Sequence, residues 1–360
     1  MTLRELNRAT LSRQMLLSRE KRTVVNAIGH LVGVQAQLPR PPFTGLWSRL
    51  ENFDRADLAS AVHKRTVVRA TSMRGTIHLM AAADFLKFRG CLQESLDAGL
   101  RAILRERADA LDLPSLLAVA RAYFETPHTF EDARDHLVSK FPRGDERAMG
   151  YAARIGVPLI QVPSADPWAF PARADFVSAQ SWLGKPIAGA SALGPLALRY
   201  LAAYGPASVK DAQSWTGLGN LEPTFAGLGN KLVTVPGPSG KPLYDLPDAP
   251  RPDGDTPAPV RFLPEWDSVI VTRADERIVA RADRPRVFLP GLRIAALVLV
   301  DGMAAGAWKV SATSRLATLH IESFKTWPAA VRREVSAEGE MLLRFVEPHA
   351  KAFDLKVTTA

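Results

Sequence analysis

A repeated order of helices followed by two short β-rich segments constrains the fold of this chain most strongly. Helical patterns fill most of residues 3–62, and β-rich segments follow at residues 66–71 and 76–80. Gly75 lies between these segments, where a tight hairpin turn favours glycine. A winged helix–turn–helix unit has this order: its helices come first, and a two-stranded hairpin, the wing, follows them. The sequence therefore predicts one such unit over residues 1–82.

The same order recurs in two further stretches, residues 83–190 and residues 191–248. In both, helical patterns come first and β-rich segments follow. The expected wing strands are residues 159–162 with 168–170 in the second copy, and residues 231–235 with 242–246 in the third. The expected helices are residues 84–107, 113–124, a helix opened by Thr129, residues 145–156, 196–204, 209–215 and 221–228.

Helix starts are marked by residues whose side chains can accept a hydrogen bond from the first turn. Thr23 precedes the apolar stretch that we expect to form the second helix, and Asp54 precedes the helix that contains Leu58. Thr129 and Ser208 occupy the same kind of position in the second and third copies.

The last hundred residues change character. Residues 247–259 are rich in Pro, Asp and Gly and read as a linker. Residues 260–360 are expected to form a small β-rich, barrel-like domain, with Asp301-Gly302 as a hairpin turn. Its expected strands are residues 269–272, 293–300, 305–310, 316–324 and 343–345, with a helix at residues 327–343. The predicted fold class is α+β, mainly α, with three tandem winged helix–turn–helix units and this C-terminal domain.

The charge of the chain is uneven. The net charge is +9, and residues 1–110 contain 18 Lys and Arg against 10 Asp and Glu, so this third carries +8 of it. A localised positive field favours a polyanionic partner, with nucleic acid first and an anionic membrane surface second. No long run of Lys or Arg occurs, so we expect a folded basic surface rather than a basic tail.

Other features limit the compartment. Cys91 is the only cysteine, which excludes a disulfide within the chain and fits a reducing cytoplasm. The first eight residues lack the apolar core of a signal peptide. The longest apolar run, residues 294–300, is too short to span a bilayer. We therefore expect a cytoplasmic protein without a membrane partner.

Several common chemistries lack their sequence signatures. The seven histidines show no zinc-ligand spacing with one another or with Cys91. No Walker-type loop, no GxGxxG and no Gly-x-Ser-x-Gly nucleophile elbow occurs. We therefore expect no metal and no cofactor.

Gln35 and Gln37 are the strongest candidate site residues. They follow an apolar stretch and precede the break at Pro39. In extended backbone, residues i and i+2 point to the same side, so both carboxamides could face one small pocket. Each amide offers an acceptor oxygen and two N–H donors, enough to hold one water or one polar edge from two directions. The alternative is a polar helix terminus that satisfies free backbone carbonyls.

Several further segments together resemble one family, the AlkZ/YcaQ winged-helix DNA glycosylases. The resemblance runs from end to end, and the order and spacing of the motifs carry it. The matching segments are residues 6–10, 13–14, 30–37, 45–50, 73–79, 204–208, 215–218 and 262–267. Glu265 and Trp266 depart from the family pattern within the last of these segments.

The resemblance implies three winged-helix units around a concave DNA channel, closed by a β-barrel. It implies excision of N-alkylated purines from double-stranded DNA and unhooking of interstrand crosslinks by a monofunctional, monomeric glycosylase. The family's catalytic motif corresponds to Gln35 and Gln37 here. Some members with this Gln-x-Gln form protect antibiotic producers from their own alkylating product, so antibiotic self-resistance is a further role that the resemblance allows.

Four further residues are candidates for DNA binding. Arg69 and Arg74 on the first wing are expected to contact phosphates, which would carry no sequence information. The alternative is a solvated hairpin surface. His78 lies on the same wing, and its alternative is a structural hydrogen-bonding role. Lys241, in the turn of the third wing, is expected to contact a phosphate, with an inert surface turn as the alternative.

Two functions without catalysis compete with a glycosylase. One is a winged-helix DNA-binding protein such as a regulator, and the other is a protein that sequesters a drug. A regulator has no need of the Gln-x-Gln pair. Three winged-helix units in one chain also suit a clamp better than a dimeric repressor, whose symmetry mirrors a palindromic site. The fold alone does not choose between these functions.

Overall fold

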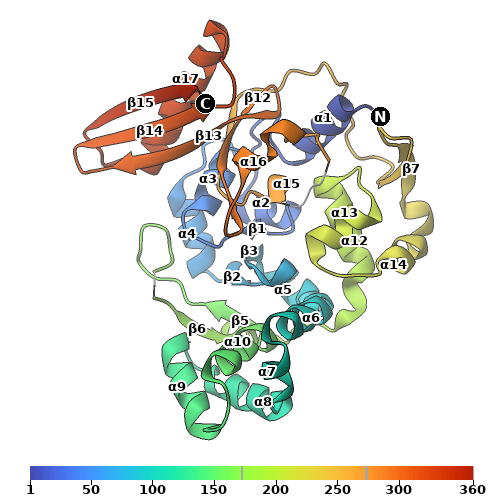
Figure 1. The fold of residues 1–360 in the computed structure, drawn as a ribbon, viewed down its shortest axis with the longest axis vertical. Coiled ribbons are helices and arrows are strands. Elements are labelled where there is room, and N and C mark those ends of the chain that lie inside the picture. The colour runs from blue at the N-terminus through green and yellow to red at the C-terminus, as the bar shows by residue number, and fades with distance from the viewer. Residues whose placement is uncertain (172, 272–274, 360) are drawn as a thin grey trace.

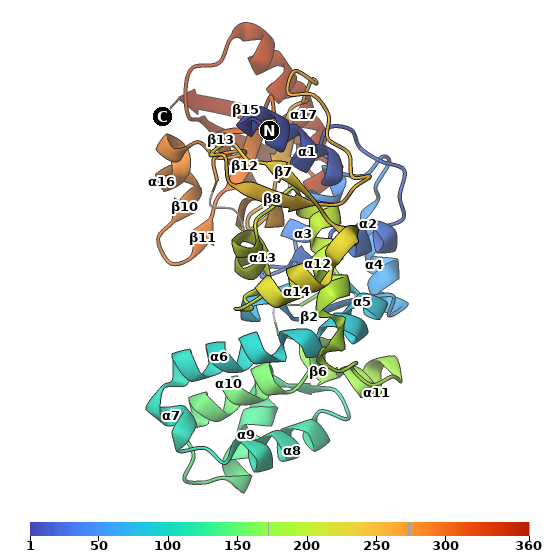
Figure 2. The ribbon, with the colours of Figure 1, turned by 90° about the vertical axis from the view of Figure 1, so that its right-hand side faces the viewer.

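The computed structural model describes residues 1–171, 173–271 and 275–359. Figure 1 shows an elongated molecule in which a helical body formed by residues 93–156, labelled α6 to α10, lies below a larger body. The larger body contains the N-terminal helices, the third copy of the repeated order and the C-terminal sheet. Figure 2 shows the same two bodies from the side, with the β-rich segments of the first and second copies between them.

The first copy matches its predicted element order. The hairpin formed by β2 and β3 is antiparallel, with Ala70 opposite His78, and Gly75 lies in its turn at a φ of +70°. Thr23 and Asp54 cap their helices as predicted, through side-chain bonds to Asn26 N and Ala56 N. The elements are α1 (Leu3–Arg13), α2 (Val24–His30), β1 (Val34–Gln35), α3 (Pro41–Trp47), α4 (Arg55–His63), β2 (Val67–Thr71) and β3 (Ile77–Ala81).

The second copy departs from the sequence prediction at its start. The single helix expected over residues 84–107 is divided, first by a short 3-10 segment at Gly90–Leu92 and again at Arg105, whose φ is +51°. A Cβ at Gly90 would lie 2.0 Å from the Ala188 carbonyl oxygen, so only glycine allows this close approach. The elements are α5 (Ala82–Phe88), α6 (Gln93–Leu104), α7 (Glu106–Asp109), α8 (Leu113–Tyr123), β4 (His128–Thr129), α9 (Phe130–Lys140), α10 (Glu146–Gly156), β5 (Leu159–Gln161), β6 (Asp175–Ser178) and α11 (Ala179–Leu183).

The predicted second wing is wrong in one strand. β5 pairs with β6, with Ile160 opposite Val177, and not with residues 168–170. Phe170 is instead buried in the hydrophobic core of the first copy. β5 also pairs with β2, and the resulting six-stranded sheet has the order β1-β3-β2-β5-β6-β4. One sheet therefore joins the first and second copies.

The third copy follows the prediction closely. Ser208 caps its helix in a capping box with Asp211, and β7 and β8 form the expected hairpin. Tyr200, Tyr204 and Trp215 pack together in its core, with ring centroids 5.2 to 5.5 Å apart. The elements are α12 (Leu193–Tyr204), α13 (Val209–Thr216), α14 (Glu222–Gly227), β7 (Val233–Pro236) and β8 (Pro242–Asp245).

The C-terminal region is an open sheet, so the predicted barrel-like closure is wrong within the described residues. Its strand order is β15-β14-β13-β12-β9, and β15 and β9 are the two edges. α17 packs on the sheet and buries Val335, Leu342 and Val346 with Phe262 and Leu319 in one core. A helix covering the sheet buries its apolar face without closure. The strands are β9 (Arg261–Leu263), β12 (Ala296–Val300), β13 (Met303–Ala312), β14 (Leu316–Ser323) and β15 (Ala352–Thr359).

Several shorter predictions in this region also need correction. Residues 268–271 are helical, in α15, and not a strand, while Thr272 lies outside the described residues. Residues 343–345 continue the helix. Residues 293–300 form two strands in different sheets, because β11 turns back onto β10. The elements concerned are α15 (Ser268–Val271), α16 (Arg284–Val287), β10 (Phe288–Leu289), β11 (Arg293–Ile294) and α17 (Ala329–Val346).

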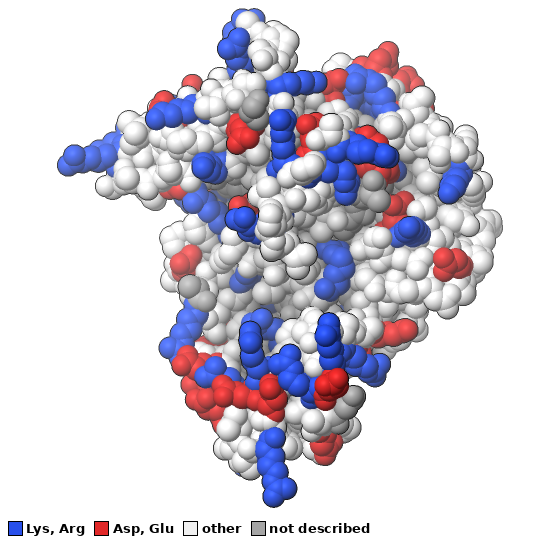
Figure 3. All heavy atoms as spheres, in the orientation of Figure 1, with Lys and Arg blue, Asp and Glu red and all other residues white. Residues whose placement is uncertain are grey.

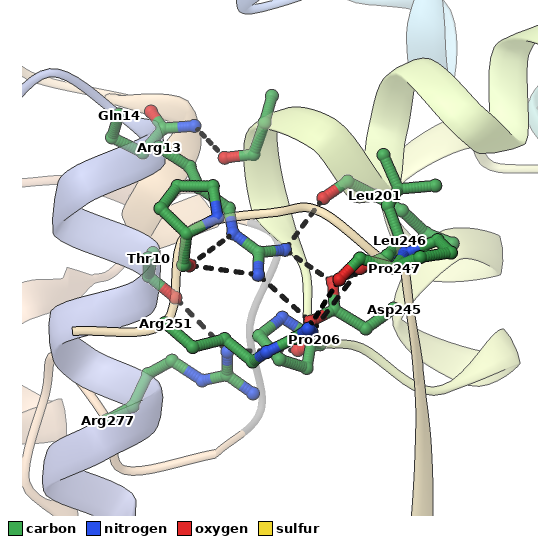
Figure 4. A network of polar contacts seen from close by, with 12 residues as sticks. Thr10, Arg13, Gln14, Leu201, Pro206, Asp245, Leu246, Pro247, Arg251 and Arg277 are labelled. Carbon is green, nitrogen blue, oxygen red and sulfur yellow. Dashed lines mark hydrogen bonds and ion pairs between the residues drawn. The ribbon is translucent and has the colours of Figure 1, made fainter. Parts of the chain in front are cut away.

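Buried ion pairs connect the N-terminal helix to distant parts of the chain. The Arg13 guanidinium donates to both carboxylate oxygens of Asp245, at 2.6 and 3.0 Å, and Arg251 donates to the same carboxylate at 2.7 Å (Figure 4). Arg13 also donates to the Leu201 carbonyl oxygen. Asp245 is completely buried, so its charge is neutralised inside the protein.

These ion pairs reduce the positive charge that residues 1–110 place on the surface of the protein. The positive surplus of the first 110 residues lies partly inside the protein, because several of its arginines are buried. They are Arg8, Arg13, Arg49, Arg69 and Arg89. Three of them pair with acids from the last third of the chain: Asp301, Asp245 and Asp267. The expected basic surface is therefore smaller than the sequence suggests, although Figure 3 shows Lys and Arg above and below the recessed centre of this face.

No helix within the described part of the chain is both long and apolar enough to cross a bilayer.

Candidate active site

Gln35 lies in the short strand β1, whereas Gln37 lies in the bend that follows it, so the extended backbone on which the i, i+2 argument depends ends before the second glutamine. β1 pairs antiparallel with β3, which places Gln35 opposite His78. α2 ends at His30, and its last carbonyls accept from the backbone of residues 31–33. Neither glutamine side chain therefore caps this helix, and the alternative of a polar helix terminus is wrong.

Both glutamine side chains bond to the tip of the β2–β3 hairpin. Gln35 is 5% exposed, and its Oε1 accepts a hydrogen bond from Arg74 Nη2 at 3.0 Å. Gln37 is exposed, and its Oε1 accepts from the backbone N–H of Ile77 at 2.8 Å. Since an amide oxygen has two lone pairs, each glutamine keeps one acceptor position. No described hydrogen bond uses either NH2 group.

Arg69 holds the backbone between and after the glutamines. Its Nε and Nη2 donate to the Ala36 carbonyl oxygen at 3.0 and 2.7 Å, and Nη2 donates to that of Gln37 at 3.1 Å. Its Nη1 donates to Gln161 Oε1. Arg69 is 5% exposed, and burial lowers its pKa to about 10, so the side chain stays charged at neutral pH.

The predicted surface position of Arg69 is therefore wrong. The side chain lies under the glutamine segment, because the six-stranded sheet brings Gln161 from the second copy next to it. All described hydrogen bonds of the Arg69 side chain are made within the protein, so its donors are already used. Contact between Arg69 and a DNA phosphate stays a prediction, and these internal bonds argue against it.

Arg74 connects the glutamine segment to the third copy. Its Nη1 donates to the Trp215 carbonyl oxygen, while Nη2 donates to Gln35. Burial lowers the pKa of Arg74 to about 10. The hairpin tip also lies against α13, since a Cβ at Gly217 would be 3.3 Å from the Arg74 Cα. Phosphate contact by Arg74 likewise stays a prediction.

His78 is buried and neutral. It is 1% exposed, and its Nδ1–H donates to the Thr76 carbonyl oxygen at 3.0 Å. Burial and the nearby Arg74 charge lower the pKa of His78 to about 3. This geometry matches the structural alternative and not the DNA contact that we expected, because the ring does not reach the surface.

Lys241 is exposed in the turn between β7 and β8, as expected for a wing tip. Its contact with a phosphate stays a prediction.

A cavity of about 670 Å3 opens beside Gln37, between the first and second copies. Gln35 is not among its described lining residues, so the two carboxamides do not share this cavity. Four aromatic side chains and several arginines contribute to its wall. They are Phe130, Trp168, Phe170 and Phe176, with Arg40, Arg69, Arg154 and Arg173.

Sequence reasoning missed the part of this cavity that comes from the second copy. Gln161 is 5% exposed and lines the cavity, and Trp168 and Phe170 come from the loop that was expected to be a strand. The local signal available was the proline-rich, aromatic stretch at residues 163–171, which is more typical of a loop than of a strand.

The segment that departs from the family pattern has a structural role. Asp267 is buried and accepts two hydrogen bonds from Arg49, both at 2.8 Å. Trp266 adopts a φ of +55° and donates through Nε1 to the Leu292 carbonyl oxygen. Partial burial raises the pKa of Glu265. This segment thus joins α3 to the C-terminal region.

Comparisons with known proteins show the family and the fold. A family model described as DNA glycosylase AlkZ-like matches residues 28–345. The solved structure of the Streptomyces sahachiroi DNA glycosylase AlkZ has a TM-score of 0.81 at 18% sequence identity, over 99% of this chain and 100% of that chain. No curated protein matches the chain. Because the family model covers most of the sequence, the chain belongs to the AlkZ-like family of DNA glycosylases.

Proposed function

We propose that this DNA glycosylase hydrolyses the N-glycosidic bond of cationic N-alkylated purines in double-stranded DNA, with Gln35 and Gln37 positioning the attacking water. One observation supports the proposal: the amides of Gln35, in strand β1, and of Gln37, in the bend that follows it, keep free hydrogen-bonding positions. Arg69 holds the backbone, while Arg74 and the Ile77 N–H hold the side chains. Such preorganisation lowers the cost of orienting water.

Neutral amides are sufficient for this particular leaving group. A purine alkylated at N7 or N3 is already cationic and departs as a neutral base, so it needs little acid catalysis. The enzyme has mainly to place water near the anomeric carbon as positive charge develops on the sugar. The remaining lone pairs of the two amide oxygens can accept protons of that water. A glutamine cannot act as a general base, so undamaged bases should react poorly.

The proposal extends to bulky lesions and interstrand crosslinks. Gln37 lies at the wall of an open cavity and not in a narrow slot, so a large substituent is not excluded. A chain that unhooks crosslinks would protect an organism that makes a DNA-alkylating antibiotic, and we include this self-resistance in the proposal. Three copies of the repeated order in one chain would allow action as a monomer.

We further propose that the enzyme is monofunctional. Water is the nucleophile, and none of the described residues that line the cavity is a lysine that could form a Schiff base. The product would therefore be an intact abasic site, and the strand would not be cut.

Incubation with a duplex that contains one N7-methylguanine tests this function. We expect strand breaks at the lesion only after alkali, and no covalent adduct after borohydride. Tight binding without abasic sites would favour the non-catalytic DNA-binding protein. Efficient borohydride trapping would contradict the monofunctional mechanism.

A further inference from the structure

The cavity beside Gln37 has walls of aromatic rings. Trp168 packs edge-on against Phe43, with ring centroids 5.1 Å apart, and the Arg40 and Arg55 guanidinium carbons lie 5.0 and 4.8 Å from its ring centroid. Across the second copy, Phe130 and Phe176 pack edge-on at 4.4 Å. These rings are held by their neighbours, so their positions are largely fixed before any ligand arrives.

One buried polar group faces this cavity without a second partner. Only 5% of Gln161 is exposed, and its Oε1 accepts a hydrogen bond from Arg69 Nη1. No described hydrogen bond uses its NH2 group, although this side chain lines the cavity. Its amide nitrogen is not among the fully buried polar atoms without a partner, so it stays accessible and can donate a hydrogen bond to a ligand among the aromatic walls.

The charge of the wall restricts the occupant. Arg40, Arg69, Arg154 and Arg173 line the cavity against Glu131 and Asp166. Arg173 pairs with Glu131 at 2.7 Å, and Arg40 pairs with Glu347 at 2.5 Å. The buried charge of Arg69 has no carboxylate among its described partners. A positive surplus disfavours a cationic guest, which includes the alkylated purine itself.

We propose that this cavity binds a neutral aromatic substituent carried by the lesion, so that the alkyl group and not the purine enters it. Its volume of about 670 Å3 lies within the range of small-molecule sites. The substituent would stack against Trp168 or the Phe130–Phe176 pair, with the Gln161 NH2 group as a polar contact. This inference rests on the proposed function, because it assumes that the reacting bond lies near Gln37.

The test compares single-turnover base release from four duplexes, which carry N7-methylguanine, N7-benzylguanine, N7-(cyclohexylmethyl)guanine and N7-(2-naphthylmethyl)guanine. We expect the wild-type protein to release the naphthylmethyl adduct about tenfold faster than the methyl adduct when the enzyme exceeds the DNA but stays below saturation, since stacking on aromatic side chains is worth that much. The cyclohexylmethyl adduct should lag behind the benzyl adduct. Equal rates for these two would overturn the aromatic class.

Two variants locate the effect. Trp168→Leu and Phe176→Leu should each lower the naphthylmethyl-to-methyl rate ratio toward one. Trp182→Leu is the matched control, because Trp182 is also half-buried beneath an arginine, with the Arg65 guanidinium carbon 4.0 Å from its ring centroid, but does not line the cavity. The control should keep the wild-type ratio. Thermal unfolding of each variant shows whether it is folded. Because Trp168→Leu and Phe176→Leu change different walls of the cavity, the test still stands if one of them does not fold.

The outcomes separate this inference from the proposed function. Release of N7-methylguanine with no preference for aromatic adducts would overturn the cavity proposal and leave the function standing. Equal slowing of all four adducts by Trp168→Leu and Phe176→Leu would assign the cavity to the purine and also overturn it. Failure of the wild-type protein to release any of the four bases would instead contradict the proposed function.

Discussion

Arg69 donates two hydrogen bonds to the carbonyl oxygen of Ala36, the residue that separates Gln35 from Gln37. The same guanidinium reaches Gln161, which belongs to the second copy. One buried cation thus connects the backbone of the candidate catalytic segment to the wall of the cavity beside it. This makes Arg69 a positioning residue, because it acts on the reaction only through its neighbours.

Arg69→Lys should lower the rate constant of base release by about ten- to a hundredfold, the cost of a small misplacement of reacting groups. Lysine keeps the charge but cannot bridge three oxygen acceptors with a planar fork. We expect the KM for damaged DNA to change little. Arg65→Lys is the control, since Arg65 is exposed on the same copy. A change confined to KM would contradict the positioning role.

Asp245→Asn should lower the free energy of unfolding by about 3–5 kcal/mol, because it leaves Arg13 buried beside a neutral group. Asp245 is completely buried and bonds to both Arg13 and Arg251. Urea denaturation measures this loss. Asp354→Asn is the control, because the Asp354 carboxylate is solvent-accessible where it pairs with Lys356, and an asparagine oxygen can still accept from the Leu355 N–H, so stability should change by less than about 0.5 kcal/mol. Similar losses in both variants would contradict the role of burial.

His78 should make the protein less stable in mild acid. Its pKa is about 3 when folded, against an ordinary value of 6.5. Between these pH values the unfolded chain binds a proton that the folded chain does not. The stabilisation is therefore present above pH 6.5 and is lost as the pH falls toward 3, by up to about 1.4 kcal/mol per pH unit.

His78→Gln should remove this component, so the loss of stability between about pH 6.5 and pH 5 should shrink by about 2 kcal/mol. Urea denaturation at both pH values gives the comparison. Burial also lowers the pKa of His30, but that residue is present in both proteins and cancels. Equal pH dependence in the variant and the wild type would show that His78 is not held neutral.

Binding to undamaged duplex should weaken steeply between about 50 and 200 mM salt, because phosphate contacts release counterions. Lys241→Glu should weaken it for all sequences to a similar degree, since Lys241 is exposed at a hairpin tip. Lys356→Glu, at the edge strand β15, is the control. Fluorescence anisotropy measures both. An affinity that does not depend on salt would contradict phosphate-driven binding.

The sequence predicted local structure well because the signals are local. Thr23, Asp54 and Ser208 cap their helices as predicted. The Asp301-Gly302 turn was also correct, and both residues adopt positive φ, at 49° and 80°. Hairpins with a short turn are determined by neighbouring residues.

The errors come from contacts between distant segments. Residues 168–170 are an apolar, aromatic stretch that was expected to form a strand, yet Phe170 packs into the first copy. Three strands of the C-terminal sheet, β12, β13 and β14, were found and its edge strands β9 and β15 were missed, while α17 covers the open sheet where a closed barrel was expected. A local sequence pattern predicts that a helix or strand has an apolar face, but it does not predict which distant segment packs against that face.

The candidate site shows the same division. Gln35 and Gln37 were proposed from their spacing, because two amides beside a proline break are visible in the sequence, and their catalytic role stays a prediction. Arg69 was expected at the surface and is buried, whereas His78 has the structural role given as its alternative; both lie in the six-stranded sheet that joins two copies. Charge counting was misleading for a similar reason, because Arg13 and Arg49 pair with Asp245 and Asp267, more than 200 residues away.

The two glutamines carry the central claim, and single-turnover release of N7-methylguanine by Gln35→Ala and Gln37→Ala tests it most directly. Each change should slow base release by roughly ten- to a thousandfold, the range for a lost positioning or electrostatic contact. Gln37→Asp should keep activity, because a carboxylate also stabilises the sugar cation. Gln180→Ala, at an exposed glutamine of α11, should behave as the wild type. Full excision by both alanine variants, with unchanged thermal unfolding, would show that the catalytic site lies elsewhere.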